Sequence, residues 1–143
     1  MRLEYICDLE LAYREGPTYE GKFLLVRPYG GEEGTGYGEG DGTLAGPRLH
    51  GKAHWVNHPH RRSDVTRRPW VILADDGAQI LFTLQGRTFF EDDTGKQLLH
   101  TTFEAEDERY RWLNRSVCVL EGVIDAQTLS IRARIYACVH ELV

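Results

Sequence analysis

The chain carries long segments near both ends whose residues alternate between apolar and polar, and this alternation constrains the fold more than any other feature. A period of two is that of a β-strand with one face in water and the other buried. Charged residues fill most of the intervening positions of the first segment. Both segments are therefore predicted to be half-buried strands. Their alternating apolar residues are Leu3, Tyr5, Cys7, Leu9, Leu11 and Tyr13, and then Leu129, Ile131, Ala133, Ile135, Ala137 and Val139.

Further strand-like runs recur between these two segments, with turn residues at their boundaries. Asp75-Asp76-Gly77 predicts a tight hairpin, because Asp-Gly adopts the positive φ angles that hairpin turns need. Only residues 107–113 suggest a short helical turn. About eight strands with short connections predict an all-β, antiparallel, closed or nearly closed β-barrel of lipocalin-like general shape. The intervening runs are 22–29, 48–56, 70–74, 79–85, 98–103 and 116–123.

The 143 residues are expected to form one domain around one core. Hydrophobic residues make up 41% and charged residues 27%, a balance typical of folded globular proteins. One segment, about 30–46, is rich in glycine and acidic residues, so we expect it to be a loop that could act as a lid.

Charge and cysteine content restrict the partners and the compartment. A net charge of -5 disfavours nucleic acid and anionic membranes as partners, because both bind broad cationic surfaces. Three widely spaced cysteines, Cys7, Cys118 and Cys138, predict free thiols rather than disulfides or a zinc site. No signal-peptide pattern or apolar span is seen, so we expect a cytoplasmic protein.

Four histidines, His50, His54, His58 and His60, crowd into one segment. Imidazole is a common transition-metal ligand, and His58-Pro59-His60 followed by Asp64 has the form of a cupin metal motif. No later glycine-rich segment supplies the third histidine of that motif. The alternative is a solvated strand face that runs into a polar loop, and we expect neither a metal nor another cofactor.

A cationic stretch follows the histidines, with Arg61, Arg62, Arg67 and Arg68 interrupted by Asp64. The planar fork of arginine suits a carboxylate or phosphate, so Arg61 is a candidate clamp for an anionic group at a pocket mouth. The alternative is a solvated loop whose charges pair with acidic segments elsewhere.

Amphipathic rings and amides lie close together in two further segments. If residues 110–114 are extended, Tyr110, Trp112 and Asn114 share one face and suit a ligand pocket. The alternative is that Trp112 is core while Tyr110 and Asn114 bond to the backbone. Glu104, next to Phe103, would have a raised pKa and act as a general acid or base if it faced an apolar interior.

Several of these segments together resemble a family of bacterial proteins. In order, they are Gly46-Pro47-Arg48-Leu49-His50-Gly51, Trp55, Asp75-Asp76-Gly77-Ala78, Phe103-Glu104 and Tyr110-Arg111-Trp112-Leu113-Asn114. They resemble the signature of the domain of unknown function 3237 family, over the chain from about Gly42 onward. The resemblance implies a compact antiparallel β-barrel and no established common activity. The chain departs from the commoner pattern at residues 57–62.

The leading hypothesis is a barrel that binds a small aromatic or partly anionic organic molecule. It could catalyse an acid–base reaction without a cofactor, such as an isomerisation, cyclisation or hydrolysis, with Glu104 or His58 as the proton carrier. The alternatives are a carrier or sensor without catalysis, a metal-dependent cupin-like enzyme using the His50 to His60 cluster, and a filled structural or homo-oligomer-forming module. The residues expected to contact the ligand are Trp55, Asn57, Arg61, Phe103, Tyr110, Trp112 and Asn114.

Overall fold

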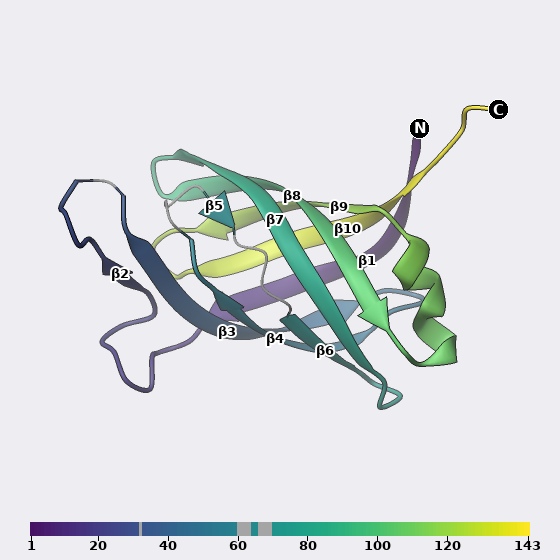
Figure 1. Cartoon of the computed structure of the whole chain (residues 1–143), viewed down its shortest axis with the longest axis horizontal. Helices are drawn as coiled ribbons and strands as arrows, with labels where there is room; N and C mark the ends of the chain where they lie inside the picture. Colours follow the sequence, from purple (N-terminus) through teal and green to yellow (C-terminus); the bar gives the residue numbers. More distant parts are fainter. Residues whose placement is uncertain (32, 60–63, 66–69) are drawn as a thin grey trace.

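The computed structural model describes residues 1–31, 33–59, 64–65 and 70–143 and has the predicted all-β barrel fold. Eight antiparallel strands form the closed ring β1-β10-β9-β8-β7-β6-β4-β3, in which β3 returns to pair with β1 (Figure 1). Two short strands lie outside the ring: β2 pairs with β3, and β5 pairs with β7. The strands are β1 (Arg2–Tyr13), β2 (Leu24–Val26), β3 (Thr35–Ala45), β4 (Gly51–Asn57), β5 (Asp64–Val65), β6 (Trp70–Ala74), β7 (Gln79–Glu91), β8 (Thr94–Ala105), β9 (Cys118–Asp125) and β10 (Ser130–Val139).

The polar and apolar alternation of the sequence sets which side chains enter the barrel. Along β8 every second residue is buried and the residues between are exposed. The same alternation in β1 from Cys7 onward pairs with that of β10, with Leu9 opposite Ala133 and Leu11 opposite Ile131. The predicted alternation is wrong before Cys7, because the register shifts between Tyr5 and Cys7: Leu3 and Tyr5 are exposed and Ile6 is buried. A closed ring pairs every strand on both sides and so removes the free edges of an open sheet.

The prediction of a loop at about 30–46 is wrong for most of its length, because Thr35–Ala45 is strand β3. Its glycines alternate and face the barrel interior, where large rings take the space of side chains. A Cβ on Gly40 would overlap the Trp55 ring opposite it and the carbonyl oxygen of Ala12. The glycines therefore serve close packing between strand and ring, whereas we had interpreted them as flexibility.

Other predicted bounds also shift. β2 is much shorter than the expected 22–29 run, whereas β7 and β8 extend beyond theirs to form a long hairpin. The predicted Asp75-Asp76-Gly77 turn is present between β6 and β7, and in it Gly77 alone has a positive φ, +93°. A further turn, with Asp92 at φ 53°, joins β7 to β8. Paired backbone groups continue the β7 ladder through Gly86, which we had expected to end the strand.

One 3₁₀ helix, η1 (Glu108–Arg115), packs across one end of the barrel. Asp107 caps it by accepting a hydrogen bond from the backbone N–H of Arg109 at 2.9 Å. Leu113 from η1 is fully buried in the core. We call this end of the barrel the capped end and the opposite end the far end. Among the residues described, no helix is long and apolar enough to cross a membrane.

Candidate functional site

The interior near the far end holds a small set of buried polar side chains in an otherwise apolar core. Asn57 on β4 donates to the Tyr13 hydroxyl at 3.0 Å. Gln97 on β8 donates to the hydroxyl of Thr88 on β7 at 3.2 Å. All four residues are less than a tenth exposed. Buried polar groups need partners, so such a set is typical either of a specific internal network or of a ligand site.

A continuous series of aromatic rings crosses the interior beside this polar set. Trp55 and Trp70 stack with ring centroids 5.1 Å apart, and Tyr13 contacts Trp55 edge-on at 4.4 Å. The series continues from Trp70 through Phe82 to Phe103. Edge-on and stacked contacts are the arrangements that aromatic pairs prefer, so these rings form one packed aromatic core.

A cavity of about 20 Å³ lies between the rings and the polar groups. This is about the space of one water molecule. The indole Nε1 of Trp55 is buried and has no hydrogen-bond partner among the residues described, whereas Nε1 of Trp70 donates to the Val56 carbonyl at 2.9 Å. A buried donor left without an acceptor is destabilising, and an acceptor supplied by water or a ligand would relieve it. The residues around the cavity are Leu11, Tyr13, Trp55, Asn57, Trp70, Leu84, Gln97, Leu99, Leu120, Ile131 and Ala133.

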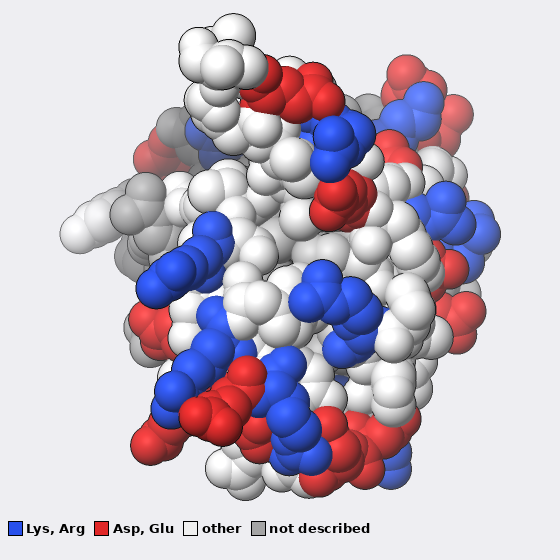
Figure 2. All heavy atoms as spheres, turned by 90° about the vertical axis from the view of Figure 1, so that its right-hand side faces the viewer, with Lys and Arg blue, Asp and Glu red and all other residues white. Residues whose placement is uncertain are grey.

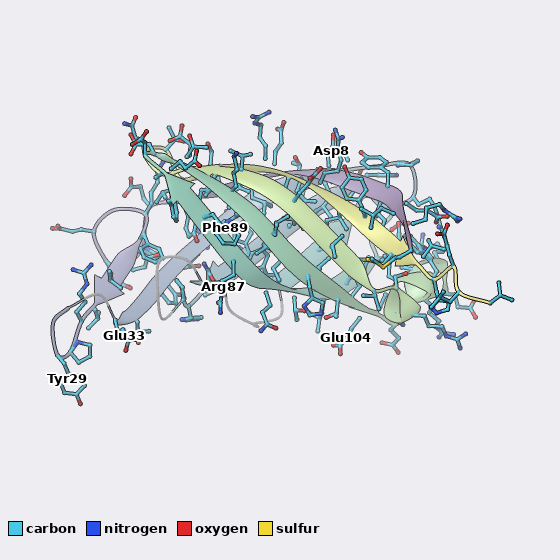
Figure 3. All side chains as sticks on the ribbon, turned by 90° about the horizontal axis from the view of Figure 1, so that it is seen from above. Asp8, Tyr29, Glu33, Arg87, Phe89 and Glu104 are labelled. Carbon is cyan, nitrogen blue, oxygen red and sulfur yellow. The ribbon has the colours of Figure 1, made fainter. Side chains whose placement is uncertain are left out.

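The structure brings only part of the predicted ligand set together. Trp55 and Asn57 line the cavity, and buried Phe103 lies deeper in the aromatic series. Glu104 is exposed on the outer face of β8, so the condition for its predicted acid–base role, an apolar surrounding, is not met (Figure 3). Because successive side chains of a strand point to opposite faces, Glu104 points outward and its neighbour Phe103 points inward.

His58 follows the last residue of β4 and is half-buried against the ring of Tyr37, with ring centroids 4.8 Å apart. Its neighbour Asn57 points into the barrel, whereas Tyr37 lies between the inward-facing Gly36 and Gly38 of β3. His58 therefore packs on the outer side of the β3–β4 pair. Arg61, the predicted anion clamp, lies outside the described residues.

Tyr110, Trp112 and Asn114 do not share an extended face, because they lie on η1 at the capped end. The Asn114 side chain donates to the Ala105 carbonyl at 2.8 Å and accepts from the Ala105 N–H at 2.7 Å. Trp112 is partly buried, with the guanidinium of Arg48 over its ring at 3.6 Å. These contacts hold η1 against the barrel. Asn114 bonds to the backbone as the structural alternative for this segment expects, whereas Trp112 is only partly buried and Tyr110 bonds to a side chain.

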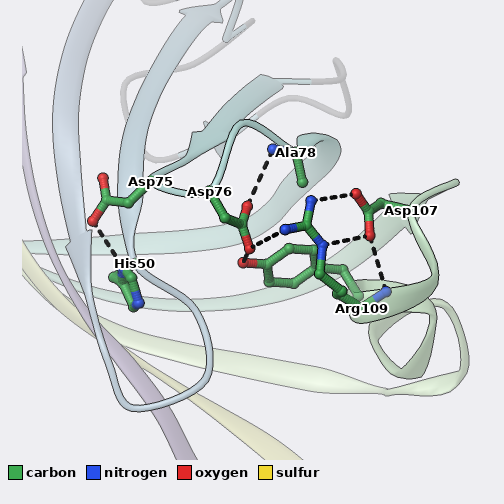
Figure 4. A network of polar contacts seen from close by, with 7 residues as sticks. His50, Asp75, Asp76, Ala78, Asp107 and Arg109 are labelled. Atoms are coloured by element: carbon green, nitrogen blue, oxygen red, sulfur yellow. Dashed lines mark hydrogen bonds and ion pairs between the residues drawn. The ribbon is translucent and has the colours of Figure 1, made fainter.

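Tyr110 belongs to a polar network that joins η1 to the β6–β7 hairpin (Figure 4). Its hydroxyl donates to Asp76 at 2.5 Å, and Arg109 bridges Asp76 at 3.3 Å and Asp107 at 2.7 Å. The hydrogen bond to Asp76, followed by burial, raises the pKa of Tyr110 to about 12. Bonds from Arg109 lower the pKa of Asp107 to about 2. All of these groups are mutually satisfied, which is typical of a structural clasp.

The three described histidines of the predicted cluster, His50, His54 and His58, do not come together. His50 lies 2.6 Å from Asp75, and His54 lies 3.0 Å from Asp41, both on the exposed face. Among the residues described, no three metal-binding side chains come together. His60 and the side chain of Asp64 lie outside the described residues.

Sequence reasoning missed four of the residues around this polar and aromatic region: Tyr13, Trp70, Thr88 and Gln97. Gln97 carried a usable signal, since it occupies a buried position of the period-two pattern in β8 where an apolar residue is expected. Its pairing with Thr88 could not be predicted without knowing the register in which β7 and β8 pair.

Comparisons with known proteins support the fold. No protein-family model and no curated protein matches the chain. The fold is similar to that of a protein of unknown function from Clostridium acetobutylicum, at a TM-score of 0.76 and 15% identity, covering 95% of this chain and 97% of that one. A β-barrel-like protein from Acinetobacter baumannii gives 0.70 at 13% identity, covering 95% and 94%. An enzyme from Penicillium herquei gives 0.58 at 17% identity, covering 94% and 93%.

Proposed function

We propose that this chain binds a small, uncharged aromatic molecule in the barrel interior near the far end. The observation that carries the proposal is the buried Trp55 Nε1, which lacks a hydrogen-bond partner among the described residues and borders a cavity lined by Asn57 and Gln97. The rings of Tyr13, Trp55 and Trp70 in the lining favour an aromatic ligand, and the amides favour one with a carbonyl or hydroxyl group. On the quoted sequence signature, we also propose membership of the domain of unknown function 3237 family.

Entry of a ligand larger than water requires the far end to open. Phe23 contacts Tyr13 edge-on at 6.0 Å and is only partly buried, so among the described residues we take it as a displaceable cover. Phe23 precedes the three-residue strand β2, which pairs with β3 alone. A segment held by so few ladder bonds can move without breaking the ring.

Binding without turnover is the form of this function that the described residues favour. No carboxylate or imidazole side chain is buried in the interior over the described parts of the chain. Acid–base chemistry there would need a proton carrier from elsewhere. A carrier or sensor therefore fits the described interior better than an isomerase, cyclase or hydrolase.

The second candidate is a filled barrel with a structural or oligomer-forming role, and the small cavity volume favours it. The two candidates differ in one observable property. A binding barrel takes up a neutral aromatic compound in a saturable way, whereas a filled barrel does not.

The test is a titration with benzamide, followed by native mass spectrometry and intrinsic tryptophan fluorescence. We expect saturable binding with a one-to-one complex. The variant Ala133→Leu fills the cavity wall and should abolish binding, whereas the matched control Ala12→Leu, on the outer face of β1, should retain it. Absence of binding by the wild-type protein, or equal binding by both variants, would support the filled barrel.

A further inference from the structure

A second hollow lies outside the barrel, at the capped end. It is a cleft of about 360 Å³ between the paired ends of β1 and β10, the helix η1 and the segment that joins β3 to β4. Ligand sites in proteins commonly measure roughly 300–1,000 Å³. The cleft is separate from the interior cavity: none of its lining residues lines that cavity.

Basic side chains from three different segments converge on this cleft: two arginines and one histidine. Arg48 comes from the β3–β4 connection, Arg115 from the last turn of η1, and His140 from the residue after β10. None of the three forms an ion pair with a carboxylate in the described part of the chain, although most other described arginines do. Figure 2 views this end of the molecule and shows Lys and Arg side chains around a largely uncharged area.

Arg48 is held in a geometry that leaves its donors available. Its guanidinium lies over the Trp112 ring at 3.6 Å, so the ring covers one face of the group. The N–H groups of a guanidinium point along its edges, in its own plane, and stacking therefore leaves them available for bidentate binding of an oxyanion. Trp112 thus positions the cation, and a part of its ring lines the same cleft.

One carboxylate, that of Glu4, also lines the cleft. Arg2 donates to it at 2.8 Å, and the two charges compensate each other. The remaining charge of the lining comes from Arg48 and Arg115, together with His140 when it is protonated. A protein of net charge -5 therefore carries a locally cationic hollow, with donors that lack an internal acceptor.

We propose that this cleft binds a small organic oxyanion, a carboxylate or a phosphate ester, between Arg48 and Arg115. The proposal does not depend on the interior site. A carboxylate or phosphate presents two oxygens to one guanidinium, and the second arginine supplies a further charged hydrogen bond.

The experiment titrates the protein with sodium benzoate and with phenyl phosphate, using amide chemical shifts in nuclear magnetic resonance spectra. Benzyl alcohol, which has the aromatic ring but no negative charge, is the control for binding through the ring alone. We expect saturable shifts at Arg115, Ser116 and His140 with both anions and none there with benzyl alcohol. The ratio of the two affinities shows which oxyanion the cleft prefers.

Two variants make the result decisive. The double variant Arg48→Gln with Arg115→Gln removes two exposed charges and should weaken binding at least about tenfold. The matched control Lys96→Gln, on the outer face of β8, should bind as the wild type does. Unchanged affinity in the double variant, shifts confined to other residues, or no binding of either anion would overturn the proposal. Circular dichroism on each variant confirms that the barrel is folded.

Discussion

At the scale of single residues, the clasp between η1 and the β6–β7 hairpin shows how far side-chain roles can be predicted from sequence. The segment Tyr110 to Asn114 stood out because it mixes rings with an amide. Its conformation did not follow from that composition, since Tyr110 bonds to Asp76, which is distant in sequence. The residue types indicated a special role, and only the fold could decide between a structural role and ligand binding.

Replacement of Tyr110 by Phe tests the clasp directly. The substitution removes a buried hydrogen bond to a charged carboxylate, so we expect the free energy of unfolding to fall by about 1–3 kcal/mol. Tyr136→Phe is the matched control, because its hydroxyl bonds to Glu121 on the exposed surface at 3.1 Å. It should change stability by less than about 0.5 kcal/mol in urea unfolding. Equal effects of the two substitutions would contradict the role of Tyr110.

The cysteines give a second prediction at this scale. Burial raises the pKa of the Cys7 thiol to about 12 and that of Cys118 to about 11. The thiolate is the reactive form, so both should react with a disulfide reagent only when the barrel unfolds. Cys138 is partly exposed and should react first. Rapid modification of Cys7 in the native protein, measured by peptide mass analysis, would contradict this account.

At the scale of elements, the strands with clear alternation were predicted and the glycine-rich strand was not. β1 from Cys7 to Tyr13 and β10 from Ile131 to Ile135 show the period of two clearly, because each of these stretches buries one apolar face. β3 buries one face as well, but its inward positions are glycines, so an analysis of apolar residues finds no pattern. The rings of Phe23, Tyr13 and Trp55 fill the space at Gly36, Gly38 and Gly40, a relation between segments that local sequence cannot show.

Substitution of Gly40 by Ala tests this explanation of β3. The added Cβ would meet the Trp55 ring and the Ala12 carbonyl oxygen, and we expect a destabilisation of about 1–3 kcal/mol. Thr43→Ala, on the exposed face of the same strand, should change stability by less than about 0.5 kcal/mol. If Gly40 served only flexibility, its replacement by Ala would leave the midpoint of thermal unfolding unchanged or raise it.

The charged end of η1 predicts a pH dependence. Arg109 lowers the pKa of Asp107 to about 2, below the ordinary value of about 3.9 for an unfolded chain. The carboxylate therefore stabilises the fold above about pH 4, and this contribution is lost as the pH falls from about 4 toward 2. We expect Asp107→Asn to be less stable than the wild type at pH 6, with the difference shrinking across this window.

Urea unfolding at a series of pH values measures that difference. Glu20→Gln, which removes an exposed carboxylate without an ion pair to a described residue, is the control. It should follow the wild type throughout. A stability difference between Asp107→Asn and wild type that stays constant from pH 6 to pH 2 would show that the carboxylate charge is not what stabilises the helix.

At the scale of the whole molecule, closure of the sheet separates the interior from two chemically different ends. The polar and aromatic set lies near the far end, and the clasp and the cationic cleft lie at the capped end. The sequence predicted the barrel, because alternation and turns are local properties. It did not predict which polar residues meet inside, because Asn57 meets Tyr13 and Gln97 meets Thr88 only through strand register.

The central claim is that the interior holds a small aromatic ligand against Trp55. Its most direct test is the indole N–H resonance of Trp55, assigned with Trp55→Phe, during titration with benzamide. We predict that this resonance moves downfield and saturates as Nε1 gains an acceptor, while the Trp70 indole, already bonded to Val56, moves less. A Trp55 resonance that does not move at saturating benzamide would contradict the claim.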